Sequence, residues 1–261
     1  MNKLNIPPLD EQAAKAALEH QKILAKPPLA LGKLEPVAIQ IAAMTGNPAP
    51  RLKDKAVVLF AADHHIADHG LSLTSTDVTY IQTRNFLQGG GTINAFTRNA
   101  GARLSVVDVG VNYDFGDLPG LVKRKVMHGA SDFSRGPAMT REQALECLQV
   151  GIDMAREEKA RGLDIVAAGE MGIGNTTPSS AIVSVLTGTP VETVTGRGSG
   201  VKGEVIRKKI ELIEQGIALN NPDPSDAIDV LAKVGGPEIG AMAGLMLGAA
   251  SLRVPIVIAS V

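Results

Sequence analysis

Cysteine and aromatic residues are scarce in this sequence, and each shortage excludes a class of protein. Cys147 is the single cysteine among 261 residues, so the chain has no disulfide framework and no multi-cysteine zinc or iron–sulfur site. Tryptophan is absent and aromatic residues make up 3% of the chain, which argues against a base-stacking platform for nucleic acid. This cysteine usage favours a reduced, cytoplasmic setting.

An excess of charge of one sign and long apolar runs are also missing. The 26 basic and 27 acidic side chains leave a net charge of −1, which gives no electrostatic signature for nucleic acid or an anionic membrane. No stretch reaches the ~18 consecutive apolar residues of a membrane-spanning helix, and residues 1–10 do not resemble a signal peptide. The hydrophobic fraction of 44% is enough for a sizeable core. We therefore expect a soluble globular protein with neither a nucleic-acid nor a membrane partner.

Short apolar runs rich in β-branched residues alternate with helical patterns along the chain. The runs predict buried parallel strands at residues 56–61, 104–109, 163–168 and 254–258. The helical patterns occupy residues 10–24, 140–159, 203–219 and 225–233. Asp10 is placed to cap the first helix, and Thr140 with Gln143 forms a capping box at the second. The alternation predicts an α/β fold with a doubly wound, mostly parallel, Rossmann-like sheet flanked by helices.

The pair Pro27-Pro28 marks the one weak domain boundary. We expect residues 1–30 to be the N-terminal helical segment of a small domain and residues 31–261 to form the α/β domain. Ligands of such sheets bind beyond the carboxyl ends of the strands. The segments that follow the predicted strands are therefore the candidates for chemistry.

The segment from Gly169 to Pro178 is the most informative of these. It leaves a predicted strand, crosses three glycines and enters a helix, with Thr177 expected at the N-cap and Pro178 at the first helical position. Glycines let the backbone approach a ligand, and free N–H groups at a helix start bind phosphate or carboxylate. Glu170, at the strand tip, can face the same ligand. A capped turn without a ligand is the alternative, and the spacing fits neither a Walker P-loop nor a dinucleotide fingerprint.

Two further glycine clusters are weaker signals. Residues 196–200 precede a helix that holds Arg207, Lys208 and Lys209, a pattern that suits either a phosphate or a solvated basic face. Residues 88–92 open another helix, where helix–helix contact explains the glycines equally well.

Residues 63–69 hold three of the five histidines. Histidine and aspartate on so short a segment can bind zinc, although a loop that forms the polar rim of a binding site is the more common arrangement. A metal-dependent hydrolase centred on Asp63, His64, His65 and His69 is therefore one alternative function. Cys147 lies within a helical pattern, so we expect it in the core rather than as a nucleophile.

Together these segments resemble the nicotinate-nucleotide:dimethylbenzimidazole phosphoribosyltransferases, a family of cobalamin lower-ligand assembly. The resemblance covers most of residues 35–258 in the family's order, and GEMGIGNTT is its most specific stretch. The matching stretches are AADHHIADHG (61–70), DVTYIQTRNFLQGGGTIN (77–94), LSVVDVGV (104–111), GPAMTREQA (136–144), GEMGIGNTT (169–177), GRGSG (196–200) and DVLAKVGGPEIGAMAGLMLGAA (229–250).

The resemblance implies transfer of phosphoribose from nicotinate mononucleotide to a benzimidazole-type base. The products would be an α-ribazole 5′-phosphate and nicotinate, with inversion at the anomeric carbon. Pyridinium nicotinate is a good leaving group, so this chemistry needs neither metal nor cofactor. Carboxylates suit the remaining tasks, which are to take a proton from the incoming base and to stabilise an oxocarbenium-like centre. The family is typically dimeric, so the resemblance also implies a homodimer.

Carried over residue by residue, the resemblance assigns the catalytic carboxylate at the reacting ribose to Glu170. The phosphate and nucleotide are expected at Gly172, Gly174, Asn175, Thr176 and Lys208. The base pocket is expected at Thr74, Ser75, Tyr80 and Gln82. Which base is accepted stays open among benzimidazole, adenine and phenolic compounds.

The sequence departs from the family in two places. The family's principal general base is a glutamate in a C-terminal segment, whereas this chain ends with Ala259-Ser260-Val261 where the family continues Asp-Gly. His65 and His69 stand where the family has glycine and glutamate. An incomplete chain, a partner that supplies the missing piece, and a non-catalytic homologue that binds nucleotide or benzimidazole are the interpretations that remain.

Overall fold

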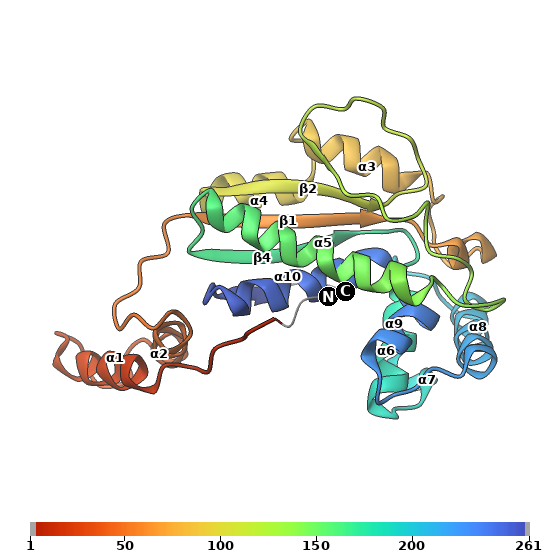
Figure 1. Cartoon of the computed structure of the whole chain (residues 1–261). Helices are drawn as coiled ribbons and strands as arrows, with labels where there is room; N and C mark the ends of the chain where they lie inside the picture. The colour runs from red at the N-terminus through yellow and green to blue at the C-terminus, as the bar shows by residue number, and fades with distance from the viewer. Residues whose placement is uncertain (1–3, 259–261) are drawn as a thin grey trace.

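A five-stranded parallel sheet organises the chain, as the computed structural model of residues 4–258 shows (Figure 1). The strand order is β3-β2-β1-β4-β5, and every adjacent pair is parallel. The four predicted runs form β1, β2, β4 and β5, so the predicted fold class is confirmed, and β3 is an additional short edge strand. The departure from the family at residues 259–261 lies outside the described residues. The strands are β1 (Lys55–Ala62), β2 (Ala102–Gly110), β3 (Leu121–Lys123), β4 (Ile165–Met171) and β5 (Ile256–Ile258).

Helices cover both faces of the sheet and its carboxyl edge. Apolar side chains of α5 (Arg141–Ala160) and α10 (Pro237–Ser251) pack on one face, and those of α3 (Val78–Leu87) and α4 (Thr92–Ala100) pack on the other. Beyond the carboxyl ends of the strands lie η1 (His65–His69), α6 (Thr176–Thr187), α7 (Val191–Val194), α8 (Glu204–Asn220) and α9 (Ala227–Val234) (Figure 1). The candidate site lies at this carboxyl edge, where the turn after β4 enters α6.

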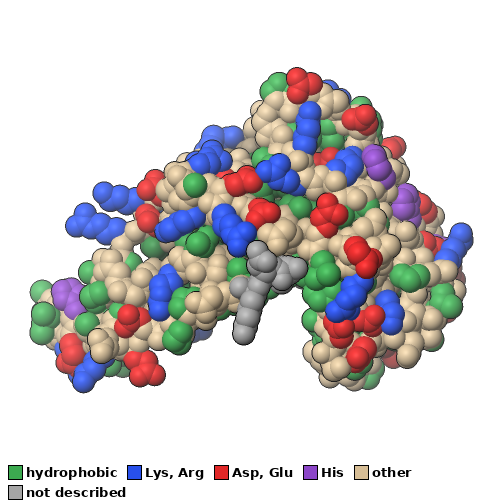
Figure 2. Space-filling view, viewed as in Figure 1, with side chains coloured by type: hydrophobic (Ala, Val, Ile, Leu, Met, Phe, Trp, Pro, Cys, Tyr) green, Lys and Arg blue, Asp and Glu red, His purple; other side chains and the backbone are tan. Residues whose placement is uncertain are grey.

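The N-terminal helices stand apart from this group. The helices α1 (Glu11–Ile23) and α2 (Leu34–Thr45) pack against each other, and the domain boundary expected at residue 30 falls in the turn between them. None of the helices in the described chain combines the length and apolarity needed to cross a membrane. Basic and acidic side chains are interspersed over the face seen in Figure 2, as expected from the balanced charge.

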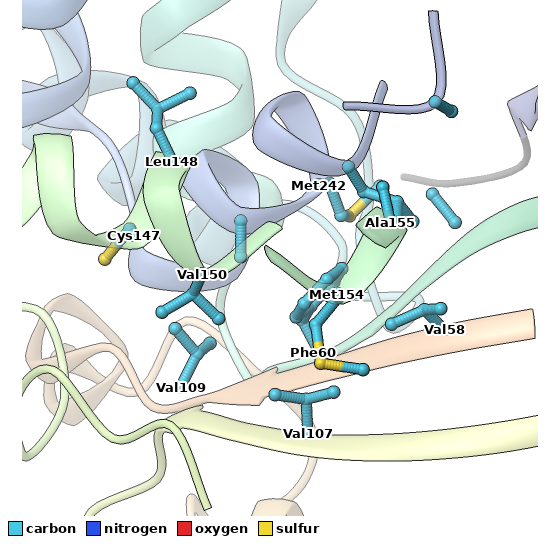
Figure 3. Close-up of a cluster of buried hydrophobic side chains, with 14 of the residues drawn as sticks. Val58, Phe60, Val107, Val109, Cys147, Leu148, Val150, Met154, Ala155 and Met242 are labelled. Carbon is cyan, nitrogen blue, oxygen red and sulfur yellow. The ribbon is translucent and has the colours of Figure 1, made fainter. Parts of the chain in front are cut away.

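The core beneath the sheet depends on close packing of α5 and α10. A Cβ atom on Gly151 would lie 1.9 Å from the backbone oxygen of Ala241, and one on Gly244 would lie 2.0 Å from the backbone oxygen of Leu148. The two helices therefore touch backbone to backbone, which only glycine permits at these positions. Cys147 is buried in this cluster, as predicted, and burial raises the pKa of its thiol (Figure 3).

Most of the predicted helix starts are confirmed. Asp10 accepts a hydrogen bond from the backbone N–H of Ala13 at 2.9 Å. Thr140 and Gln143 form the expected reciprocal capping box, with distances of 3.2 and 2.9 Å.

The predicted start of α6 is wrong by two residues. The helix begins at Thr176 with Asn175 as its N-cap residue, so Thr177 and Pro178 lie inside the first turn. The physical reason is that Thr177 is buried, with a hydroxyl that has no hydrogen-bond partner, instead of turning back to cap the helix. The segment after β1 also differs from the expected loop, because residues 65–69 form the 3-10 helix η1.

Candidate active site

The candidate site lies where β1 and β4 end side by side. Phe60 of β1 pairs with Glu170 of β4, and Ala61 pairs with Met171, so the segments after both strands leave the sheet together. Because β2 lies on the other side of β1, the order of the strands reverses at this point. Parallel α/β sheets bind ligands at such a switch point.

Glu170 is the carboxylate at the centre of this edge. It accepts a hydrogen bond from the side-chain amide of Asn175. Burial, followed by the negative charge of Glu238, raises the pKa of Glu170 to about 7, although Asn175 and His64 act in the opposite direction. A carboxyl group with this pKa is present in both protonation states near neutral pH, as groups at functional sites often are.

The glycine-rich turn after β4 is packed tightly against the segment after β1. A Cβ atom on Gly172 would lie 2.7 Å from the backbone oxygen of Ala62, and one on Gly174 would lie 2.6 Å from the Cβ atom of Ala67. Gly174 also has a φ angle of +90°, which favours glycine. These constraints explain the glycines without a ligand, and the open side of the turn faces a cavity.

That cavity, of about 220 Å³, gathers most of the predicted nucleotide-binding residues beside Glu170. The loop at residues 196–200 joins it, because the hydroxyl of Ser199 lies 3.1 Å from that of Ser72. Lining residues are Leu71, Ser72, Glu170, Met171, Gly172, Ile173, Gly174, Asn175, Thr176 and Ser199.

Lys209 is a buried lysine of α8, next to the Lys208 to which the resemblance assigns nucleotide binding. Its ammonium group donates a hydrogen bond to the hydroxyl of Thr176 at 2.6 Å, the residue is 1% exposed, and burial lowers its pKa to about 8. Lys208 is exposed and donates to the backbone oxygen of His69 at 2.7 Å, and neither lysine is among the residues that line the cavity of the glycine-rich turn. Lys209 lies three and four residues before the buried Leu212 and Ile213, which places it on the apolar face of α8. This helical spacing is the feature of the sequence that indicates its burial.

A second, wider opening of about 520 Å³ lies between the end of β4 and helices α3 and α4. Glu170 and Met171 line it together with Gln82, one of the predicted base-binding residues. Glu170 therefore lies between this opening and the cavity of the glycine-rich turn. The residues that line the wider opening are Leu59, Gln82, Phe86, Gly91, Thr92, Ile93, Gly169, Glu170 and Met171.

The other three predicted base-binding residues lie elsewhere. Tyr80 is two residues from Gln82 on α3 and points to a different side, where it stacks on Tyr113 with ring centroids 4.4 Å apart. It lines a separate cavity of about 120 Å³. Thr74 and Ser75 occupy the exposed loop before α3 and line none of these openings. The role of these residues in base binding stays a prediction.

The histidines of residues 63–69 point to different partners. The Nε2 atom of His69 lies 2.8 Å from Asp132, and the Nε2 atom of His65 lies 3.2 Å from the backbone oxygen of His128. Among residues 4–258, no group of three or more histidine, cysteine or acidic side chains is arranged to hold a metal ion. The structure therefore offers the metal-dependent alternative no ligand set in this range.

His64 forms a buried pair that no pattern in the sequence predicts. Its Nε2 atom lies 2.7 Å from the Oε1 atom of Glu238, in the first turn of α10. Burial on its own lowers the pKa of His64, but the negative charges of Glu238, Asp63 and Glu170 outweigh it and raise that pKa. The Oε2 atom of Glu238 and the Oδ1 atom of Asp63 are buried without a hydrogen-bond partner. Buried polar atoms without partners are uncommon, and one reason for them is a catalytic role.

Comparisons with known proteins identify the family. A family model described as phosphoribosyltransferase matches residues 6–260. The nicotinate-nucleotide–dimethylbenzimidazole phosphoribosyltransferase of Geobacter sulfurreducens is 50% identical over 251 residues, which cover 96% of this chain and 71% of that protein. The enzyme of the same name from Roseiflexus sp. (strain RS-1) is 52% identical over 253 residues, which cover 97% of this chain and 72% of that protein.

Solved structures give the same result. The crystal structure of CobT from Thermus thermophilus superposes with a TM-score of 0.90 at 41% identity, and covers 95% of this chain and 74% of that one. A second structure from the same organism, of nicotinate-nucleotide–dimethylbenzimidazole phosphoribosyltransferase, has a TM-score of 0.89 at 40% identity and covers 96% of this chain and 74% of that one. Because sequence and fold agree, the chain belongs to the nicotinate-nucleotide–dimethylbenzimidazole phosphoribosyltransferase family.

Proposed function

We propose that the chain transfers phosphoribose from nicotinate mononucleotide to dimethylbenzimidazole or a related base, and so releases nicotinate and forms an α-ribazole 5′-phosphate. One observation supports this proposal above the others. Glu170 lines both the cavity of the glycine-rich turn and the wider opening beside Gln82. A carboxylate between two cavities is where a nucleotide held on one side and a base held on the other would meet.

The first cavity suits the phosphate of the nucleotide. The turn of Gly172, Gly174, Asn175 and Thr176 leads into α6, and the unpaired N–H groups at a helix start attract anions. Lys209 brings an ammonium group to Thr176 at 2.6 Å. Lys208, proposed from the resemblance, adds a positive charge on the outer face of α8.

The wider opening suits a flat, largely apolar base. Phe86, Ile93 and Met171 supply apolar surface there, and the side-chain amide of Gln82 supplies a polar group. The amide can orient a ring nitrogen of the base by a hydrogen bond. Thr74, Ser75 and Tyr80 belong to the proposed base-binding set on the resemblance alone.

The reaction needs one bond to break and one to form at the anomeric carbon. The bond to the pyridinium nitrogen breaks with its electron pair, which leaves neutral pyridine nitrogen on nicotinate. A nitrogen lone pair of the base forms the new bond on the opposite face, and the base then loses its N–H proton to a general base, a role that the resemblance gives to a glutamate of the family's C-terminal segment. Ionised Glu170 stabilises the positive charge that develops on the ribose between these events.

Turnover with both substrates tests the proposal. The protein is incubated with nicotinate mononucleotide and a panel of benzimidazole, purine and phenolic acceptors, and free nicotinate is measured by chromatography. Release that depends on an acceptor supports the transferase. Tight binding of either substrate by calorimetry without release by any acceptor would instead indicate a non-catalytic binding protein. A homodimer and a cytoplasmic location remain predictions, the first from the resemblance and the second from the cysteine usage.

A further inference from the structure

We propose that His64 is a positioning residue for Glu170: clamped by Glu238, its imidazolium is a fixed, buried positive charge behind the Glu170 carboxylate. The inference rests on the proposed function, because it adds a device that keeps Glu170 in its working form. It concerns residues of β4, α10 and the segment after β1, and does not depend on which base is accepted.

The clamp is a buried ion pair between distant parts of the chain. His64 follows β1 and Glu238 lies 174 positions later, yet Nε2 and Oε1 are 2.7 Å apart. The two side chains are 1% and 0% exposed. Glu238 lies in the first turn of α10, where the partial positive charge of the helix start favours a carboxylate. The carboxylate thus lies at a favourable position on its own helix while it binds the ring.

Two glycines leave room for the imidazole and fix its place. A Cβ atom on Gly236 would lie 2.4 Å from the Cε1 atom of His64, and one on Gly172 would lie 3.3 Å from its Nε2 atom. The ring is therefore enclosed between the start of α10 and the glycine-rich turn that follows Glu170. A ring enclosed on both sides cannot swing away to solvent, so its charge stays next to the turn that follows Glu170.

The charges around the ring come from three parts of the fold. Glu238 of α10, Asp63 at the end of β1 and Glu170 of β4 all act on His64 and together raise its pKa, which favours the charged form of the ring. The charge of His65 also acts on the pKa of Asp63. The charge of Glu238 contributes to the raised pKa of Cys147 in α5.

One cation thus faces three carboxyl groups. Glu238 binds the ring directly, and the Oδ2 atom of Asp63 accepts a hydrogen bond from the backbone N–H of Asn112 at 2.8 Å. Glu170 is the member of the three that lines both proposed substrate cavities. The charges of His64 and Glu238 therefore affect the reaction through the pKa of Glu170.

His64 and Glu238 shift the pKa of Glu170 in opposite directions. Burial and the charge of Glu238 favour its protonated form, whereas the charge of His64 favours its ionised form. A protonated carboxyl cannot stabilise a positive ribose carbon, so the imidazolium extends the pH range over which the site works. A purely structural histidine would have no such effect.

Direct titration of Glu170 tests the proposal without any substrate. Protein labelled with carbon-13 at the glutamate carboxyl carbons is titrated by NMR, and the Glu170 signal is assigned by its loss in Glu170→Gln. In the wild type we expect a midpoint near 7. His64→Gln keeps a hydrogen-bond donor for Glu238 but removes the charge, so the midpoint should rise by about one pH unit. Glu238→Gln should lower it, because the charge of Glu238 acts on Glu170 more strongly than that of His64.

Glu158→Gln is the matched control. Glu158 is equally buried, but it binds Arg103 and Ser105 at the opposite end of the strands. This variant should lose stability and leave the Glu170 midpoint unchanged. An unchanged midpoint in His64→Gln, or shifts in the same direction for both site variants, would overturn the proposal.

Two further measurements keep the outcome decisive. If His64→Gln does not fold, the nitrogen-15 shifts of His64 in the wild type decide: an imidazolium through neutral pH supports the proposal, and a neutral ring overturns it. Where nicotinate is released, the acid limb of kcat should move with the midpoint in each variant. Absence of release from the wild type would overturn the proposed function, whereas the titration of Glu170 would still decide the role of His64.

Discussion

Glu170 illustrates, at the scale of one residue, a conflict between stability and function. Burial beside Glu238 raises its pKa to about 7, so the folded chain holds a proton there more tightly than the unfolded chain does. The same burial strengthens its interaction with a positive ribose carbon, because the surroundings screen charge poorly. The ionised side chain is therefore suited to catalysis, but it lowers the free energy of unfolding.

Replacing Glu170 by glutamine should separate catalysis from binding. The amide keeps the shape of the carboxyl and can still accept the hydrogen bond from Asn175, but it carries no charge. We expect kcat to fall by about 100-fold or more, while the Kd of nicotinate mononucleotide changes little. Wild-type kcat should rise with pH to a plateau above about 7, where Glu170 is ionised. Steady-state rates and calorimetry check both values, and wild-type turnover in Glu170→Gln would show that the residue is structural.

The same substitution should stabilise the protein at alkaline pH. For a carboxyl group with a raised pKa, the free energy of unfolding falls as the pH rises from the unfolded pKa, 4.5, towards about 7. Glu170→Gln removes this loss, so the gain should be about 1–3 kcal/mol at pH 8 and near zero at pH 4. Urea denaturation at the two pH values measures it. Glu211→Gln, on the exposed face of α8, is the control, and an equal gain at both pH values would contradict the account.

Lys208 and Lys209 offer a paired test of the phosphate site. Lys209→Met keeps the apolar stem in the core and removes the ammonium that reaches Thr176, so the Kd of nicotinate mononucleotide should rise about tenfold. Lys208→Met removes an exposed charge that solvent screens, so the rise should be smaller. Calorimetry of the two variants side by side decides, and a larger effect for Lys208 would reverse the assignment.

The helices differ in how well the local sequence predicts them. The capping box of Thr140 and Gln143 locates α5 to within a residue, because its hydrogen bonds join positions three apart. The Gly/Ala-rich α10 is not evident as a helix in the sequence, because its glycines lower helix propensity and serve contact with α5 instead. The predicted start of α6 is misplaced because tertiary burial decides the orientation of Thr177.

The contact between α5 and α10 yields a prediction for stability. In Gly151→Ala the new methyl group would meet the backbone oxygen of Ala241 at 1.9 Å, so the helices must move apart. We expect a loss of about 1–3 kcal/mol in the free energy of unfolding. Gly136→Ala is the matched control, because nothing lies within 4 Å of its Cβ position, and it should change stability by less than about 0.5 kcal/mol. Equal losses in both variants would show that helix contact is not the cause.

For the whole molecule, local sequence patterns locate the sheet and the centre of the site but not the site's wider surroundings. Alternating strands and helices predict the doubly wound sheet, and the glycines around Glu170 predict the turn, because both signals are local. The pair of His64 and Glu238 joins positions 174 apart, and no local pattern indicates it. Tyr80 and Gln82 are near neighbours in sequence, yet the pitch of α3 sends them to different cavities.

The central claim is that Glu170 lies between a bound nucleotide and a bound base and supports transfer from one to the other. The most direct measurement follows both products when nicotinate mononucleotide and dimethylbenzimidazole are added to the protein. We predict one equivalent of nicotinate for each equivalent of α-ribazole 5′-phosphate, with neither formed when the base is left out. No nicotinate with any benzimidazole, purine or phenolic acceptor, from protein shown to be folded, would contradict the claim.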